Sequence, residues 1–401
     1  MSTLALVVFW GSVAMILYVY AGYPTLLLLL GAMRRRAPSP RDGLTPRVSL
    51  IISAYNEEDV IREKIVNSLG LDYPRARLEI VVASDGSDDR TTAIAREYAA
   101  EGVRVYDFPA RRGKNATLND VVPRATGQII VFTDANGKFQ RDALRKLTRH
   151  FADPRVGCVC GELIYVSADD NLVAKGYDVY WRYDQRLKRL ESRLRCLLGA
   201  NGSIFAIRKG LYRRLPGEVC NDMVLAIQIA ARGHDVLYEP EAISLEAGSQ
   251  DAPEELGRRS RIVGRGILGV RTVLPDILEG GRVLLLWELL SRKLLRYCTP
   301  FFFFLLALSN AFLWSGIYGW TLAAQGFFYL LALVSFFLRP LGVHLRVLSV
   351  PHYFVLGNIA TALGWAKVLA GRELAKWETV GRAYDTNIPP DADVPLTLSR
   401  R

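Results

Sequence analysis

The stretch RVSLIISAYNEEDVIREKIVNSL, residues 47–69, decides the fold. It begins with a nearly continuous apolar run, RVSLIISAY, which contains several β-branched residues and is typical of a strand buried on both faces. The following NEEDVIREKIVNSL has apolar residues at helical spacing. A buried strand that leads directly into a helix predicts one strand–helix unit of a parallel sheet.

The same alternation continues along the chain. RLEIVVAS leads into DGSDDRTTAIAREYAAE, VRVYDFP leads into GKNATLNDVVPRA, and GQIIVFTD closes the series. Alternation of this kind predicts an α/β fold with a mostly parallel sheet that helices cover on both faces. Ligands of such sheets bind beyond the carboxyl ends of the strands, so the residues at those ends are the first candidates for function.

Polar residues stand at three of these strand ends: Tyr55-Asn56-Glu57-Glu58, Asp85-Gly86-Ser87-Asp88-Asp89 and Asp134-Ala135-Asn136. Asp85 lies at a strand tip, where a carboxylate can accept a hydrogen bond from a base N–H or a ribose hydroxyl. Asp134 and Asn136 could hold a divalent metal, and they are equally compatible with an ordinary turn. Glu58, Asp88 and Asp89 have a simpler explanation, because carboxylates in a first helical turn cap free N–H groups.

Two common nucleotide motifs are absent from the region of predicted strands. Residues 47–139 contain neither a GxGxxG run nor a GxxxxGK[ST] phosphate loop, so a dinucleotide is not expected there. The basic run RRGK, residues 111–114, follows the third predicted strand and suits a diphosphate, although a solvated loop would explain it too. The five cysteines lack zinc-site spacing and are expected to be reduced thiols.

Three or four segments are apolar enough to meet a membrane. Residues 4–32 carry no charge and are long enough to span, and residues 299–317 and 319–338 are further spans. Residues 347–369 form a weaker one, and residues 283–297 have the pattern of an amphipathic interface helix or, alternatively, a core helix. An odd number of spans after the central domain would export the basic tail against the positive-inside rule, and the sequence leaves this conflict open.

These features predict a linear order of domains. We expect an N-terminal transmembrane helix (1–33), a linker (34–46), a cytosolic α/β domain (47–275), an amphipathic interface region (276–298), transmembrane helices (299–370) and a basic tail (371–401). The net charge is +11. Because no nucleic-acid motif accompanies the charge and the basic clusters flank hydrophobic segments, we expect contact with membrane lipid and no nucleic acid.

The motifs SAYNEE, ASDGSDDRT, RRGKNATLN and TDAN, in this order, closely resemble the family-2 glycosyltransferases of the GT-A fold. The most similar members are the membrane-embedded bacterial enzymes of extracellular polysaccharide synthesis, relatives of the cellulose, hyaluronan and chitin-oligosaccharide synthases. The resemblance covers residues 47–266 and implies a Rossmann-like GT-A domain with transmembrane helices. It also implies the inner membrane of a bacterium as the location, with the catalytic domain in the cytosol.

The resemblance implies a reaction as well. Members of the family transfer a sugar from a nucleoside diphosphate sugar, here a UDP-sugar by expectation, and invert the anomeric centre with the help of Mg²⁺ or Mn²⁺. The acceptor would be a saccharide or a lipid-linked saccharide, and other proteins of polysaccharide synthesis and export would be partners.

Site residues follow from the resemblance motif by motif. It implies that the catalytic base is Asp222, within CNDMVLAIQIAARGHDVLYEPEA, and that Asp134 and Asn136 bind the metal. Nucleotide-sugar binding is assigned to Tyr55, Glu57, Asp85, Lys114 and Asp134. Contact with the acceptor or the diphosphate is assigned to Glu162, Gly202, Arg258, Arg261 and Arg265.

The sequence departs from the family pattern in several places. Asn136 and Asn221 replace acidic residues, and in GRRSRIVGRG the residues Arg258 and Ile262 stand for the Gln and Trp of the processive members. Without the Trp, limited addition is as well supported as polymer synthesis. A polyprenyl-phosphate sugar synthase and a catalytically silent, nucleotide-binding membrane subunit remain as alternatives.

Overall fold

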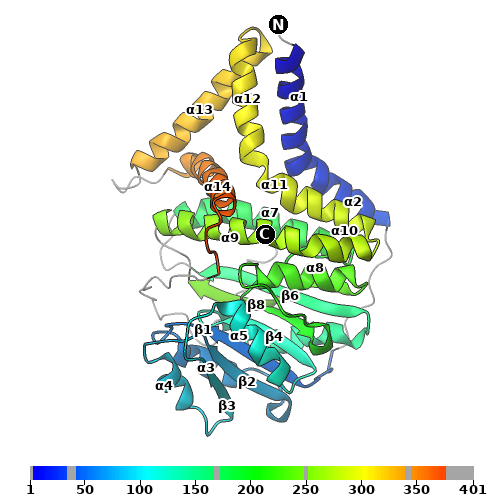
Figure 1. Cartoon of the computed structure of the whole chain (residues 1–401), viewed down its shortest axis with the longest axis vertical. Coiled ribbons are helices and arrows are strands. Elements are labelled where there is room, and N and C mark those ends of the chain that lie inside the picture. Colours follow the sequence, from blue (N-terminus) through cyan, green and yellow to red (C-terminus); the bar gives the residue numbers. More distant parts are fainter. Residues whose placement is uncertain (1–2, 34–41, 167–171, 248–251, 339–344, 376–401) are drawn as a thin grey trace. The chain divides into compact units, whose positions relative to one another are not determined.

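The chain forms two compact units whose segments alternate along the sequence. One unit consists of residues 1–35, 169–194 and 249–372, and the other of residues 36–168, 195–248 and 373–401. The computed structural model describes residues 3–33, 42–166, 172–247, 252–338 and 345–375 (Figure 1). The first unit is helical, and the second contains the sheet.

The sheet unit confirms the predicted α/β architecture. Its described strands form one sheet in the order β3-β2-β1-β4-β7-β6-β8-β5. They are β1 (Val48–Ala54), β2 (Leu78–Ser84), β3 (Val103–Asp107), β4 (Ile129–Asp134), β5 (Lys138–Phe139), β6 (Val156–Val166), β7 (Phe205–Arg208) and β8 (Asp235–Ala247). The four strands predicted from the alternating pattern are β1 to β4, and they are mutually parallel. Strand β7 is antiparallel to both of its neighbours, so the whole sheet is mixed.

The described residues of the sheet unit form the α-helices α3 (Ile61–Leu69), α4 (Thr91–Arg96), α5 (Lys114–Val121), α6 (Ala143–Thr148) and α8 (Asn221–Ala231). Each of α3, α4 and α5 connects two parallel strands, as a crossover must. Strand β1 lies between β2 and β4, and all seven of its residues are buried. Burial on both faces explains why its sequence is continuously apolar instead of alternating.

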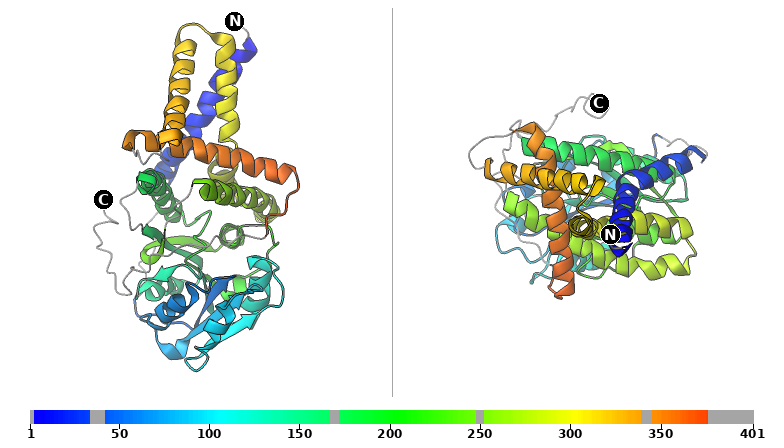
Figure 2. Two further views of the ribbon diagram at one scale, coloured as in Figure 1. Left: turned by 90° about the vertical axis from the view of Figure 1, so that its left-hand side faces the viewer. Right: turned by 90° about the horizontal axis from the view of Figure 1, so that it is seen from above.

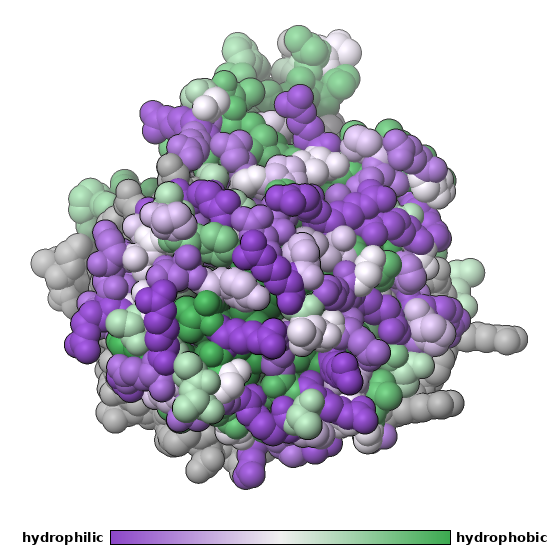
Figure 3. Space-filling view, turned by 60° about the horizontal axis from the view of Figure 1, so that its bottom comes forward, coloured by the Kyte–Doolittle hydropathy of each residue, from purple (hydrophilic) through white to green (hydrophobic). Residues whose placement is uncertain are grey.

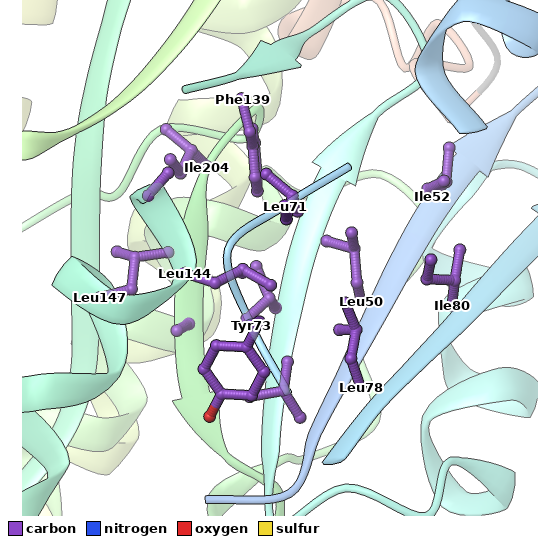
Figure 4. Packing of buried hydrophobic residues seen from close by; sticks show 14 of the residues in the cluster. Leu50, Ile52, Leu71, Tyr73, Leu78, Ile80, Phe139, Leu144, Leu147 and Ile204 are labelled. Atoms are coloured by element: carbon purple, nitrogen blue, oxygen red, sulfur yellow. The ribbon is translucent and has the colours of Figure 1, made fainter. Parts of the chain in front are cut away.

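The main hydrophobic core fills the space between the sheet and its helices. Leu50 of β1 and Ile80 of β2 are fully buried in it, together with Leu144 of α6. Figure 4 shows these side chains around Tyr73, whose hydroxyl donates to the carbonyl of Pro46 at 2.6 Å. The core therefore holds β1 in place from one side of the sheet.

The helical unit contains most of the apolar segments. Its helices are α1 (Thr3–Leu17), α2 (Tyr23–Met33), α7 (Leu172–Arg193), α9 (Ala252–Glu279), α10 (Val283–Leu289), α11 (Leu295–Tyr297), α12 (Thr299–Leu313), α13 (Ile317–Leu338) and α14 (Arg346–Leu369). Helix α1 packs against α12 through Phe9 and Leu313, both buried. Figure 2 shows α12 and α13 side by side, with α14 lying across them.

Three described helices are long and apolar enough to cross a membrane: Thr3–Met33, Ile317–Leu338 and Val347–Leu369. The expected span at residues 299–317 forms the shorter helix Thr299–Leu313, which follows Val283–Tyr297 with a bend of 57°. If that bent pair is counted as one span, the number is four. The exposed side chains of these membrane-span candidates are largely apolar. The face of the molecule that is turned forward in Figure 3 is mostly hydrophilic.

Helix α7 is tied to the other helices of its unit by apolar and charged contacts. Its Leu187, with Leu194 just beyond its end, buries against Tyr23 and Leu27 of α2. Arg292 is buried as well and donates to Asp184 of α7 at 2.6 Å. Arg292 also donates to Glu191 of α7 at 2.9 Å, so its buried charge is paired with two carboxylates of that helix.

We predict that Gly127→Ala destabilises the sheet unit. A Cβ at Gly127 would lie 2.4 Å from the backbone nitrogen of Ser49 and 2.7 Å from the carbonyl carbon of Val48, so β1 and β4 would have to separate. Overpacking of this kind costs about 1–3 kcal/mol. The midpoint of thermal unfolding should fall in the variant and stay unchanged in Gly210→Ala, where a Cβ meets nothing within 4 Å. Equal midpoints would contradict the close approach.

Candidate functional site

The loops that follow β1 and β2 are joined by reciprocal hydrogen bonds. Asn56 Nδ2 donates to Asp88 Oδ1 at 2.6 Å, and the backbone N–H of Asp88 donates to Asn56 Oδ1 at 3.0 Å. Asp89 accepts from the backbone N–H groups of Glu58 and Thr91. Asp89 therefore satisfies the N–H of Thr91 at the start of α4, as its position in the sequence allowed, whereas the Asp88 carboxylate accepts from a side-chain amide.

Asp85 is buried at the carboxyl end of β2, and its carboxylate is bonded to the loop after β3. Oδ1 accepts the backbone N–H of Arg112 and the hydroxyl of Thr117, both at 2.9 Å, and Oδ2 accepts the N–H of Gly113 at 2.8 Å. These bonds hold the loop immediately before Lys114. A contact between Asp85 and the donor nucleotide stays a prediction, and the contacts in the structure position the basic loop.

Gly86 makes this arrangement possible. Its φ is +71°, a conformation that favours glycine, and a Cβ there would lie 2.6 Å from the carbonyl carbon of Ala110 and from the nitrogen of Arg111. The basic loop therefore passes directly over Gly86.

Arg111 and Tyr55 form a stacked pair at the ends of β3 and β1. The guanidinium carbon lies 3.9 Å from the centroid of the Tyr55 ring. Nε and Nη2 of Arg111 are buried and have no hydrogen-bond partner among the described residues. Buried donors without a partner are rare in proteins, so this guanidinium is a candidate for binding an acceptor group of a ligand. The run RRGK had pointed to this loop, but Arg111 was not among the predicted site residues.

Three of the predicted residues converge on Gly202. A Cβ at Gly202 would lie 3.7 Å from Asp134 Oδ2, 3.8 Å from Asp222 Oδ2 and 3.9 Å from Lys114 Nζ. Lys114 Nζ also donates to Asp134 Oδ1. Residues from α5, β4 and α8 thus bring an ammonium and two carboxylates around Gly202, in the turn before β7.

A buried lysine forms hydrogen bonds with both ends of the turn that contains Asp134. Lys64 of α3 donates to Thr133 Oγ1 at 2.9 Å and to the carbonyl of Gly137. Burial lowers the pKa of Lys64 to about 7, while the carboxylates of Glu246 and Asp134 act in the opposite direction. The sequence prediction did not include this residue.

The two predicted metal ligands are Asp134, the last residue of β4, and Asn136, in the turn that follows it. Asn136 is half-buried in the turn after Asp134, and the described residues contain no group of three or more His, Cys, Asp or Glu side chains that could hold a metal ion. One carboxylate with one amide oxygen suits a hard cation such as Mg²⁺ or Mn²⁺ whose remaining ligands are substrate phosphates and water. The residues present fit a metal that binds together with a diphosphate.

Glu57 and Glu162, two further predicted site residues, and Asn221, which replaces an acidic residue of the family pattern, also belong to the sheet unit. Glu57 is half-buried, and its N–H donates to Thr91 Oγ1 at 2.7 Å. Glu162 is buried on β6, next to Gly161, whose carbonyl accepts from Asn201 Nδ2 at 2.8 Å. Asn221, beside Asp222, is buried, and its Nδ2 has no hydrogen-bond partner in the described part of the chain.

The predicted acceptor residues Arg258, Arg261 and Arg265 belong to α9 in the helical unit. Arg258 pairs there with Glu255 at 2.8 Å, one helical turn earlier. Their assignment to the acceptor or diphosphate stays a prediction.

Comparison with known proteins agrees with this geometry. Residues 49–215 match the family model for Glycosyl transferase family 2. The chain is 28% identical to "Probable glycosyltransferase YdaM" of Bacillus subtilis over 53% of this chain and 54% of that protein. It is 32% identical to "Beta-monoglucosyldiacylglycerol synthase" of Trichormus variabilis over 43% of this chain and 38% of that protein. The matches thus span about half, or less, of the relatives' length.

A solved structure shows the fold. The mannosyltransferase PcManGT from Pyrobaculum calidifontis, in complex with GDP-Man and Mn²⁺, aligns with a TM-score of 0.68 at 22% identity, covering 91% of this chain and all of that one. The chain therefore has a GT-A-like α/β fold with additional apolar helices.

We predict that Asp85→Asn loosens the loop before Lys114. An amide cannot accept hydrogen bonds at both of its ends, so one backbone donor would face an NH₂ group. Losing a hydrogen bond to a charged group costs about 1.5–3 kcal/mol. Hydrogen exchange at the amides of Arg112 and Gly113 should accelerate. Asp107→Asn is the control, because it alters only a surface pair with Arg96 and should leave exchange at these two amides unchanged. Equal exchange rates in the two variants would refute the role of Asp85 in holding the loop.

Proposed function

We propose that this protein is a membrane-bound, inverting glycosyltransferase. It would move a sugar from a nucleoside diphosphate sugar to a saccharide or a lipid-linked acceptor at the bacterial inner membrane. The observation that carries the proposal is the convergence of the charged groups of Lys114, Asp134 and Asp222 on Gly202. A leaving diphosphate requires positive charge, and an attacking hydroxyl requires a base, and this arrangement offers both at one point.

The donor would bind along the ends of the parallel strands. Arg111, stacked on Tyr55, offers buried N–H donors to oxygen acceptors of the base or the phosphates. Asp85 holds the loop that continues into Lys114, whose ammonium would neutralise the diphosphate. Because this loop is fixed before ligand arrives, little ordering is left for the binding step.

Asp134 and Asn136 would hold a divalent metal together with the donor. When bound, such an ion stabilises the negative charge that accumulates on the departing diphosphate. Asp134 Oδ2 faces the space at Gly202, and its Oδ1 is already paired with Lys114. Asn136 supplies a neutral ligand where the family more often has a carboxylate, so the protein contributes one negative charge fewer. We therefore expect a metal affinity that depends on the donor phosphates.

Asp222 is proposed as the general base. Its Oδ1 accepts the N–H of Met223 at 2.9 Å, and its Oδ2 is the oxygen that faces Gly202. An acceptor hydroxyl held there would give its proton to Oδ2 while its oxygen attacks the anomeric carbon from the face opposite the diphosphate. Direct displacement of this kind inverts the anomeric centre.

The proposal is tested by incubating the purified full chain with UDP-, GDP- and dTDP-sugars and bacterial lipid extract. One of these sugars should release its nucleoside diphosphate. Asp222→Asn should lower turnover of that donor by a factor of about 10²–10⁴, the usual contribution of a general base, with unchanged donor affinity. Asp142→Asn, which alters a surface pair with Lys146, should behave as wild type. Turnover of Asp222→Asn near the wild-type rate would exclude it as the base, and no release from any donor would contradict the proposed activity and leave a silent nucleotide-binding subunit as the explanation.

Metal removal gives a separate prediction. EDTA should stop donor cleavage, and Mn²⁺ or Mg²⁺ should restore it, because the proposed ion would be held by the two side chains of Asp134 and Asn136 and could be extracted by a chelator. Asp134→Asn should require a higher Mn²⁺ concentration for half-maximal activity than wild type. Full activity of the wild-type protein in EDTA would remove the metal from the proposed mechanism.

A lipid acceptor is the favoured second possibility. The 32% identical relative is named as a synthase of a glucosylated diacylglycerol, and three described helices of this chain can cross a membrane. The mass of the product from the same incubation distinguishes the acceptors: one sugar on a polyprenyl phosphate or another lipid, or a growing saccharide.

A further inference from the structure

Lys64 is a charged side chain in the interior of the sheet unit. It lies on α3 between the buried residues Ile61 and Ile65, and 1% of its surface is exposed. Its Nζ also lies 4.2 Å from the centroid of the Phe139 ring. Burying an ammonium is costly unless polar groups surround it, so the contacts of Lys64 need an explanation beyond core packing.

The two acceptors of Lys64 stand on either side of one turn. Thr133 directly precedes Asp134-Ala135-Asn136, and Gly137 directly follows it. The Lys64 ammonium bonds the Thr133 hydroxyl at 2.9 Å and also the carbonyl of Gly137. One cation therefore ties together both ends of the segment that presents the Asp134 carboxylate and the Asn136 amide.

Buried polar groups of β8 connect the Asp134–Gly137 turn to the segment that contains Gly202. A Cβ at Gly137 would lie 2.9 Å from Ser244 Oγ and 3.4 Å from Glu246 Oε1, so the turn packs directly on β8. Glu246 Oε1 accepts a hydrogen bond from Ser203 Oγ, and Ser203 follows Gly202. The buried polar groups beneath the turn thus reach the glycine on which Lys114, Asp134 and Asp222 converge.

We propose that Lys64 is a positioning residue of the donor site: it fixes the Asp134–Gly137 turn so that the Asp134 carboxylate and the Asn136 amide face the diphosphate and its metal. The inference rests on the proposed function for its ligand, and on the contacts of Lys64 for its structural part. Lys64 touches neither donor nor acceptor and acts through the turn. A purely structural lysine would stabilise the fold without affecting how the turn receives its ligand.

Lys64→Met is the principal variant, because it keeps the length of the side chain and removes the ammonium. In the full chain without ligand, hydrogen exchange at the amides of residues 135–137 should become faster. In the donor-cleavage assay, the Mn²⁺ concentration for half-maximal rate should rise about 10- to 100-fold, the usual effect of losing a residue that orients a metal ligand. Lys64→Arg, which keeps the charge, should recover part of this loss.

Two further variants keep the test decisive. Thr133→Val removes one of the two contacts and should give a smaller change of the same kind, even if Lys64→Met does not fold. Lys146→Met removes an exposed pair with Asp142 and should change neither readout. Lys64→Met or Thr133→Val with wild-type exchange and wild-type Mn²⁺ dependence overturns the proposal, and so does a variant that loses only thermal stability. If no donor is cleaved by wild type, the proposed function fails, and the exchange of the turn still decides whether Lys64 positions it.

Discussion

Parallel backbone pairing of β1 with β2 on one side and with β4 on the other is the constraint on which the rest of the structure depends. The pairing aligns Ala54 with Ser84 and Ser53 with Asp134, so three strands end at the same edge of the sheet. Because side chains alternate between faces, a slip by one residue would turn Asp134 to the opposite face. The buried apolar residues of β1 oppose such a slip, and the hydrophobic core therefore fixes the register of the site as well as its stability.

Charge is distributed unevenly around the resulting site. Lys114 and Asp134 form a pair at its centre, Asp222 faces them across Gly202, and Lys64 lies beneath the turn. The Arg111 guanidinium adds positive charge in the loop before Lys114. Cations and carboxylates gathered in this way suit the proposed reaction, in which negative charge leaves on the diphosphate and a proton passes to a base.

The alternating pattern was sufficient to predict the parallel strands. Lys114, Asp134 and Asp222 were assigned to one site through the family resemblance, and the structure places their charged groups around Gly202. The sequence did not predict that the Asp85 carboxylate holds the loop before Lys114. These hydrogen bonds depend on the path of the loop over Gly86, which strand and helix patterns do not specify. Lys64 was overlooked because it directly follows Arg62 and Glu63, two ordinary surface residues. Its spacing from Ile61 places it on the buried face of α3, and this was the signal that could have revealed it.

The interleaving of the two units has a consequence for producing the protein in parts. In the sequence, α7 of the helical unit lies between β6 and β7 of the sheet unit. Removing the N-terminal helices and everything beyond residue 248 would therefore still leave α7 in the fragment. Leu187 and Leu194 would then lose Tyr23 and Leu27, which cover them in the full chain. A water-soluble catalytic fragment therefore requires replacing α7 with a short linker, or making its apolar face polar, in addition to trimming the ends.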